Sequence, residues 1–221
     1  MRLNKVVAAG ALLTGALVAA PAQAQVNYYT QGYFTSATNP ACSNPAPVAG
    51  APVGNTCLIA NGFTLTYTPK ALNPGLIGDG SVVSLGNFAL TGSGNATIPS
   101  GAVMFTLAIQ QTNPTTGTGT TVGSISGTVQ TNTPNGDFSS LIWTPAPSVI
   151  MIGNTTYSLI FDSTGPAANR GYAIGVNNAA TPTSIQAQVT ATPEPASMTL
   201  LATGLIGVFG AVRRRRKLAT A

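Results

Sequence analysis

The sequence predicts an all-β protein whose body is a β-sandwich of jelly-roll or immunoglobulin-like kind. Three observations support this prediction. Apolar and polar residues alternate in several short segments, such as residues 63–67, 125–129 and 185–189. Residues typical of turns separate these segments, and no convincing amphipathic helix precedes the C-terminal tail. A period of two gives a strand one apolar face, so we expect each of these segments to be half-buried in a sheet.

The segments between the turns are the expected strands: residues 26–34, 57–68, 81–90, 102–110, 121–130, 138–143, 149–152, 155–161, 172–176 and 183–190. The turns that separate them are Asn61-Gly62, Asp79-Gly80, Asn135-Gly136-Asp137, Gly153-Asn154 and Gly165-Pro166. The two residues Gly153-Asn154 join neighbouring strands, which predicts a tight β-hairpin. Residues 112–121 are rich in threonine and glycine, and we expect them to form a long, mobile hairpin loop.

The two cysteines, Cys42 and Cys57, flank a segment rich in proline, alanine, glycine and asparagine. An even pair in an oxidising compartment predicts a disulfide, which would stabilise the fold by about 3 kcal/mol. Because residues 39–56 contain four prolines, we expect the bridge to hold an irregular segment against a sheet edge. Two free thiols or a metal pair are the alternatives. The chain has no histidine, so a zinc site here would be short of ligands.

The first 24 residues have the features of a secretory signal peptide. Arg2 and Lys5 form a positive start, residues 6–20 are apolar, and Ala22-Gln23-Ala24 is a cleavage site with two small residues. Cleavage between Ala24 and Gln25 would leave Gln25 as the new N-terminus. An uncleaved membrane anchor is the alternative.

The last thirty residues, 192–221, consist of three parts in a fixed order. Pro193, Glu194 and Pro195 predict an extended segment, because proline lacks a backbone N–H and disfavours helix in the residue before it. Residues 196–212 carry no charge, and as a helix they would span about 25 Å, the short end of what crosses a bilayer. A basic cluster that stays on the cytoplasmic side follows: Arg213, Arg214, Arg215, Arg216 and Lys217.

This tail resembles the PEP-CTERM sorting signal of Gram-negative bacteria that make extracellular polysaccharide. The resemblance lies in Pro193-Glu194-Pro195, the following Ala196-Ser197, the glycine-bearing apolar segment and the arginine cluster. Family members usually have valine before the motif, where this chain has Thr192. The resemblance implies recognition by exosortase, a membrane-embedded transpeptidase that cuts near the motif, after which the body is released or transferred to another anchor. A plain single-pass anchor that nothing cuts is the alternative.

These features divide the chain into a signal peptide (1–24), a β-sandwich body (25–191) and a sorting signal (192–221). The net charge of +5 therefore misleads, because seven of the nine basic residues lie in the two terminal segments. Between Gln25 and Thr192 the chain has Lys70 and Arg170 against three aspartates, which gives the exported part a net charge of −1. A basic composition usually suggests nucleic acid, and this distribution argues against that partner.

The body offers little for catalysis, and we expect no catalytic residue, metal or cofactor. It lacks histidine, the commonest general base near neutral pH. Asp79, Asp137 and Asp162 each lie beside turn residues, so turn capping explains them better than the paired carboxylates of a glycosidase. Asp137 and Asp162 could instead hold calcium with nearby oxygen ligands.

Aromatic residues are a candidate binding surface for sugars. Tyr28, Tyr29, Tyr33 and Phe34 lie together, and Trp143 and Tyr172 could join them. Core packing is the favoured alternative: on a strand, Tyr29 and Tyr33 share one face, and Tyr28 and Phe34 share the other.

Taken together, these features predict an exported structural or adhesive protein of the cell surface or extracellular matrix. The family resemblance adds sorting by exosortase at the inner membrane and contact with extracellular polysaccharide, as in a biofilm. Two other functions remain open: a secreted glycan-active enzyme with an unrecognised carboxylate site, and a calcium-dependent adhesin.

Overall fold

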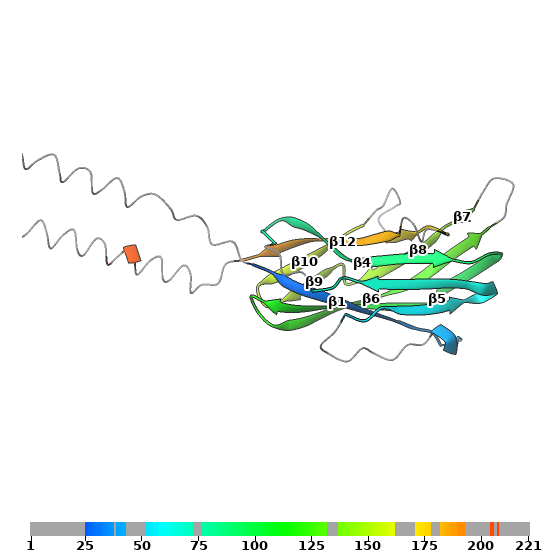
Figure 1. Ribbon diagram of the computed structural model, residues 1–221, viewed down its shortest axis with the longest axis horizontal. Coiled ribbons are helices and arrows are strands. Elements are labelled where there is room, and N and C mark those ends of the chain that lie inside the picture. The colour runs from blue at the N-terminus through cyan, green and yellow to red at the C-terminus, as the bar shows by residue number, and fades with distance from the viewer. Residues whose placement is uncertain are drawn as a thin grey trace, which may run out of the picture. The chain divides into compact units, whose positions relative to one another are not determined.

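The computed structural model of the protein describes residues 25–37, 39–42, 52–72, 77–131, 137–161, 171–177 and 182–192, together with residues 204, 205 and 207. The strands all belong to one compact unit, Ala24–Thr192, which we call the body. The body is all-β: two sheets are joined by loops, and the helical segments within its described residues are two short 3-10 turns, Pro40–Cys42 and Ala60–Gly62 (Figure 1).

The first sheet, sheet A, has the strand order β1-β5-β6-β8-β11, and β7 pairs with β6 beside β8. Its strands are β1 (Asn27–Thr35), β5 (Asn95–Asn113), β6 (Gly117–Gln130), β7 (Phe138–Ser139), β8 (Leu141–Ala146) and β11 (Tyr172–Ile174). All its pairs are antiparallel. The outer edge of β1 is partly covered, because Gly32 N donates to Val53 O (3.1 Å) and Thr30 N donates to Lys70 O (3.0 Å).

The second sheet, sheet B, has the strand order β2-β3-β4-β12-β10-β9, and its pairs are also antiparallel. Its strands are β2 (Asn55–Ile59), β3 (Phe63–Pro69), β4 (Ser81–Thr91), β9 (Val149–Ile152), β10 (Thr155–Ile160) and β12 (Thr183–Ala191). The last strand of the body, β12, therefore lies in the middle of its sheet, between β4 and β10. The Gly153-Asn154 hairpin between β9 and β10 is confirmed.

The inner faces of the two sheets pack together through a cluster of buried aromatic rings. Phe105 on β5 is the centre of this cluster: its ring lies 4.8 Å from Phe88, 4.9 Å from Phe34 and Tyr67, and 5.2 Å from Trp143, between ring centroids. Because Tyr67 and Phe88 belong to sheet B, these contacts cross from one sheet to the other. Edge-on and tilted ring pairs of this kind add to the free energy gained by burying apolar surface.

Four buried tyrosines also connect the sheets by hydrogen bonds. Tyr28 OH donates to Ser84 O (2.7 Å), Tyr67 OH to Leu85 O (2.7 Å), Tyr157 OH to Gln111 Oε1 (2.9 Å) and Tyr172 OH to Gln186 O (2.6 Å). The first, third and fourth of these bonds cross between sheets, and Tyr67 OH crosses as well, because it lies 2.8 Å from Thr30 Oγ1 on β1. The polar end of each ring is thereby satisfied inside the core.

The prediction of one strand over residues 57–68 is wrong, because this segment forms the β2–β3 hairpin. The chain reverses at Ala60–Gly62, where Asn61 (φ 63°) and Gly62 (φ 82°) both have left-handed backbone conformations. Asparagine and glycine are the residues that adopt such conformations at least cost, so Asn61-Gly62 acts as a turn inside the predicted strand. The segment predicted as residues 138–143 is likewise divided, into β7 and β8.

The hairpin expected at residues 112–121 is present, but the prediction that its loop is long is wrong. β5 continues to Asn113 and β6 begins at Gly117, so three residues make the turn. A Cβ atom on Gly119 would lie 2.3 Å from Ile150 Cγ2, and one on Gly117 would lie 2.7 Å from Ile152 Cγ2. Glycine is therefore required at these two strand positions because strand β9 packs closely over them.

The terminal segments contribute little to the described structure. The predicted signal peptide, the predicted motif Pro193-Glu194-Pro195 and the basic cluster Arg213–Lys217 lie outside the described residues. Gly204, Leu205 and Gly207 of the predicted apolar segment are helical. Among the residues that are described, no helix has the length and apolar character needed to cross a bilayer.

Candidate functional site

The tail begins where the body ends, and hydrogen bonds fix the last residues of the body in place. Thr192 N and Thr192 Oγ1 both donate to Asn154 O (3.2 Å each), and Ala191 N donates to Asp79 Oδ1 (3.3 Å). We call these four residues, Asp79, Asn154, Ala191 and Thr192, the terminal clasp. Asp79 and Asn154 both come from tight turns, so two local turns position the end of the central strand β12.

The start of the body lies at the same end as its finish (Figure 1). Asn113 Nδ2 donates to Gln25 O, and a Cβ atom on Gly153 would lie 3.0 Å from Thr115. The β5–β6 turn therefore contacts both Gln25 and the turn that holds Thr192. The cleavage between Ala24 and Gln25 stays a prediction, and β1 begins two residues after it.

The disulfide between Cys42 and Cys57 is present, as the sequence predicts. The two Cα atoms are 4.2 Å apart and both side chains are fully buried. Cys57 lies on β2, the edge strand of sheet B, and Cys42 ends the 3-10 turn Pro40–Cys42. Asn39 Nδ2 also donates to Leu58 O (2.5 Å), so the segment before Cys42 is held against this edge by a side-chain hydrogen bond as well.

The predicted aromatic residues divide into two groups. Tyr28, Phe34, Trp143 and Tyr172 are at most 1% exposed and belong to the core, so they do not form a sugar-binding surface. Trp143 and Tyr172 instead stack on each other inside the body, with centroids 5.6 Å apart. Tyr29 and Tyr33 lie on the other face of β1 and are half-buried, as the alternation on this strand predicts.

The outer face of sheet A brings Tyr29 and Tyr33 together with amide and hydroxyl groups. Tyr29 pairs with Gln110 across the β1–β5 ladder, and Tyr33 pairs with Thr106. Gln110 Nε2 donates to Gln31 Oε1 (3.4 Å), and Gln110 Oε1 accepts from Thr118 Oγ1 (2.5 Å). This row of polar side chains crosses β1, β5 and β6, from Gln31, which is 1% exposed, to Thr118, which is exposed. We call Tyr29, Gln31, Tyr33, Gln110 and Thr118 the tyrosine face.

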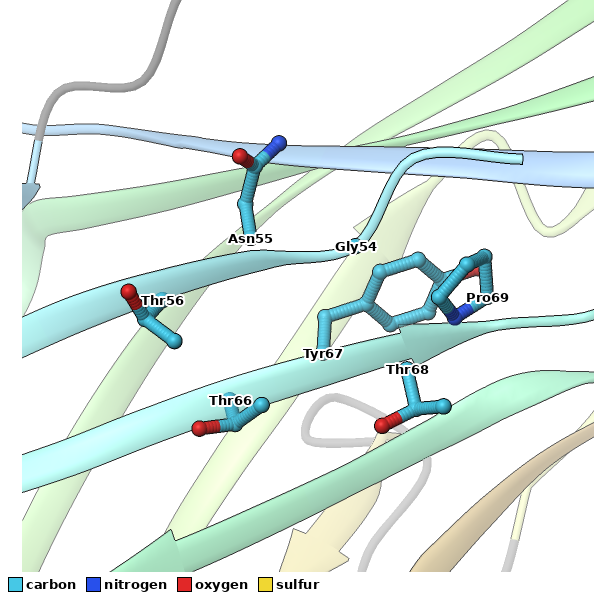
Figure 2. A pocket seen from close by; sticks show the side chains of 7 residues that line it. All are labelled: Gly54, Asn55, Thr56, Thr66, Tyr67, Thr68 and Pro69. Atoms are coloured by element: carbon cyan, nitrogen blue, oxygen red, sulfur yellow. The ribbon is translucent and has the colours of Figure 1, made fainter. Parts of the chain in front are cut away.

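An open depression of about 390 Å³ lies at the other sheet, where β2 and β3 pair (Figure 2). It is lined by Gly54, Asn55, Thr56, Thr66, Tyr67, Thr68 and Pro69. Tyr67 is 1% exposed and forms its floor, while Asn55 Nδ2 is engaged by Gly32 O (2.6 Å). The lining offers hydroxyl and amide groups and no ionisable group that faces solvent, so it suits hydrogen bonding to a neutral polar molecule.

The two described carboxylates do not come together. Asp79 lies in the turn before β4, whereas Asp137 Oδ2 accepts from Asn177 Nδ2 (2.6 Å), and Asn177 Oδ1 accepts from Gly92 N (3.4 Å) just after β4 ends. The eleven residues of β4 thus separate them by about 30 Å. Asp162 lies outside the described residues. Within the described part of the chain, no group of three or more acidic, cysteine or histidine residues could hold a metal ion.

Two features of these sites were not anticipated from the sequence. The terminal clasp depends on the register of β12 against β10, which pairs Ala191 with Thr155 and so brings Thr192 to Asn154. The sequence identifies Asp79-Gly80 and Gly153-Asn154 as turns, but it does not show that both turns lie beside the end of β12. The tyrosine face likewise requires the β1–β5–β6 register, which joins segments some 80 residues apart.

A comparison with protein families identifies the tail. The model of the PEP-CTERM protein-sorting motif matches residues 191–216, which confirms the resemblance seen at Pro193-Glu194-Pro195 and in the segments after it. The match begins at Ala191, the last residue of β12. No curated protein and no solved structure matches the chain.

Proposed function

We propose that this chain, which carries a PEP-CTERM sorting motif, is a structural or adhesive protein of the cell surface or extracellular matrix. The motif indicates an exported protein that is sorted by exosortase at the inner membrane and reaches the cell surface or the extracellular space. The finer proposal is that its body stays in contact with extracellular polysaccharide, as in a biofilm. The observation that supports this finer proposal is the combination of the motif with a β body whose described strands carry no charged residue.

The surface chemistry of the body supports contact with a neutral polymer. None of the described strands contains a charged residue, and the charged residues of the described part, Lys70, Asp79 and Asp137, all lie in connecting segments. The outer faces are instead rich in threonine, serine, asparagine and glutamine, whose hydroxyl and amide groups exchange hydrogen bonds with sugar hydroxyls as they do with water. Such a surface gives no long-range repulsion from neighbouring chains or polymers.

The tyrosine face is the part of this surface that we assign to polysaccharide. Tyrosine rings combine a large apolar area with a polar hydroxyl, which suits the apolar faces and polar edges of sugar rings. Beside Tyr29, the exposed hydroxyl of Thr118 and the partly exposed amide of Gln110 add polar groups to this face, whereas Gln31 is 1% exposed and only holds Gln110 through a hydrogen bond. Tyr29 and Tyr33 are four positions apart on β1, about 13 Å, so the face would contact an extended stretch of polymer.

In this proposal the body binds and does not catalyse. Glycoside hydrolysis by paired carboxylates needs the two groups within about 10 Å of each other. Asp79 and Asp137 lie near opposite ends of β4, and each accepts a hydrogen bond from a neighbouring group. We therefore favour adhesion over a glycan-active enzyme.

We also propose that the body is a β-sandwich of jelly-roll or immunoglobulin-like kind. Two antiparallel sheets with packed inner faces support this assignment. The chain passes repeatedly between the sheets, and β12 inserts between β4 and β10, strands far from it in sequence. Connections of this type are typical of sandwiches with Greek-key elements.

Binding of the mature protein to polysaccharide tests the proposal. The probe is extracellular polysaccharide purified from the producing cells, and the measurement is co-sedimentation of the processed protein with it. The double variant Tyr29→Ser/Tyr33→Ser is expected to bind about tenfold more weakly, because each aromatic contact contributes roughly 0.5–1.5 kcal/mol. Leu58→Ser, at a 48% exposed site on sheet B, is the matched control and should bind as the wild type does. Equal binding by all three proteins would contradict the assignment of the tyrosine face.

A further inference from the structure

The sorting motif joins the folded body without a linker. β12 ends at Ala191, the terminal clasp holds Thr192, and the next residue is Pro193 of the motif. Proline has no backbone N–H, so Pro193 cannot donate a further hydrogen bond to extend the ladder of β12. Only three residues, Pro193 to Pro195, separate Thr192 from the apolar segment that begins at Ala196. Fully extended, the chain from Thr192 to Ala196 covers at most about 14 Å.

Ala191, which lies two positions before the motif, is bound on both sides of β12. Ala191 pairs with Thr155 of β10, and its N–H is taken by Asp79 Oδ1 on the β4 side. The Asp79-Gly80 turn is itself attached to β12, because Gly80 N donates to Val189 O (2.8 Å). An enzyme that binds a peptide in extended form needs free backbone groups on both sides of the bond it cuts. With the clasp closed, the backbone N–H groups of Ala191 and Thr192 are both engaged in hydrogen bonds.

We propose that the terminal clasp sets the rate at which the sorting tail is processed, because the clasp must open before the membrane enzyme can bind residues on the body side of Pro193. This inference rests on the proposed processing by exosortase. Asp79 acts in it as a positioning residue: its carboxylate holds Ala191 and never contacts the bond that is cut. The backbone carbonyl of Asn154 has the same role for Thr192.

The clasp is suited to this role because it can open without unfolding the body. Asp79, Asn154 and Thr192 are exposed, whereas β12 before Ala191 is anchored by buried side chains such as Val189 and Ala187. Hydrogen bonds at an exposed strand end are weak individually, and their loss frays the end of the strand only. Opening therefore exposes two more residues of chain and leaves the sheet intact.

A set of four proteins tests the proposal in cells that contain exosortase: wild type, Asp79→Ala, an insertion of ten glycine and serine residues between Thr192 and Pro193, and the insertion combined with Asp79→Ala. The measurement is the rate of tail loss in a pulse–chase experiment. Asp79→Ala is expected to raise this rate about three- to tenfold, the factor that corresponds to one lost exposed hydrogen bond. The insertion should raise the rate by at least as much, because it places free chain beside the motif. In the insertion background, Asp79→Ala should change nothing, because the added residues already give the enzyme free chain.

The controls separate this inference from the proposed function. Asp137→Ala removes an aspartate near the other end of β4 and should leave the rate unchanged. Replacement of Pro193, Glu194 and Pro195 by alanine should abolish tail loss. Tail loss at the same rate in wild type, Asp79→Ala and the insertion variant would overturn the role of the clasp while leaving processing intact. Absence of tail loss from the wild type would overturn both. A thermal unfolding curve for each protein verifies that the body is folded.

Discussion

Tyrosine has two separate roles in this protein, and burial decides which role a given residue has. Tyr28, Tyr67, Tyr157 and Tyr172 fill the core and join the sheets through their hydroxyl groups. Tyr29 and Tyr33 lie on the outer face of β1. Burial raises the pKa of Tyr28 to about 12 and raises the pKa of each of the other three core tyrosines further above the usual range, because an ionised phenolate would be deprived of water.

This burial predicts that the body unfolds in alkali. In the unfolded chain a tyrosine ionises near pH 10, whereas the four core tyrosines keep their protons to higher pH. Their stabilising contribution is therefore complete below about pH 10 and is lost as the pH rises through the folded-state pKa values. Tyrosinate absorbance and circular dichroism, followed between about pH 8 and pH 13, should show ionisation of these four residues together with loss of β structure. Ionisation of all six tyrosines near pH 10 in a folded protein would contradict the account.

The sequence predicted part of this division and not the rest. The alternation on β1 correctly placed Tyr28 and Phe34 on one face and Tyr29 and Tyr33 on the other, because a strand has a period of two. It could not show which face would be covered by the second sheet. Trp143 and Tyr172 give no such local signal, since Trp143 is buried against Phe88 and Phe105 from distant strands, and Tyr172 is buried against Trp143 and Phe161.

At the scale of single elements, the β2 strand is the one that depends on a covalent link. It has five residues, lies at the edge of sheet B, and has Leu58 48% exposed. A short edge strand with an exposed leucine and no charge is open to fraying or to pairing with another chain. The Cys42–Cys57 disulfide and the hydrogen bond from Asn39 to Leu58 O hold the preceding segment against this strand.

Removal of the disulfide should therefore destabilise the body without changing its fold. The variant Cys42→Ser/Cys57→Ser is expected to lose about 3 kcal/mol of the free energy of unfolding, the entropy that closing a loop of this length removes from the unfolded chain. Urea denaturation of the oxidised wild type and of the variant measures the difference. The wild type treated with a reductant should match the variant. No difference between oxidised and reduced wild type would show that the bridge has no role in stability.

Most of the strands can be predicted from the sequence, and the errors arise where a local pattern does not show the turn or the packing of another strand. Strands β1, β4, β9, β10 and β12 follow from local alternation and turn residues. The single strand expected over residues 57–68 does not allow for the β2–β3 hairpin, although Asn61-Gly62 marks its turn, because apolar residues continue on both sides of that turn. Between β5 and β6, the threonine- and glycine-rich composition of residues 112–121 predicts a longer hairpin loop than the three-residue turn that is present. Contact with Ile150 and Ile152 of β9 explains the glycines, and a single sequence does not show that contact.

At the scale of the whole molecule, most of the charged residues lie near the two ends of the chain, and the body between them has few. The body has a net charge of −1, and seven of the nine basic residues lie in the two terminal segments, the predicted signal peptide and the sorting tail. The N-terminal and C-terminal ends of the body lie at the same end of the fold, where the β5–β6 turn and the β9–β10 turn also lie (Figure 1).

Mass spectrometry of the exported protein is the most direct test of this account. Its central claim is that the two hydrophobic ends direct a neutral β body out of the cell and are then removed. In cells with active exosortase, the protein recovered outside the inner membrane should begin at Gln25, contain the Cys42–Cys57 disulfide, and yield no peptide from residues 205–217. Recovery of the intact chain from the cytosol, with both cysteines reduced, would contradict the claim.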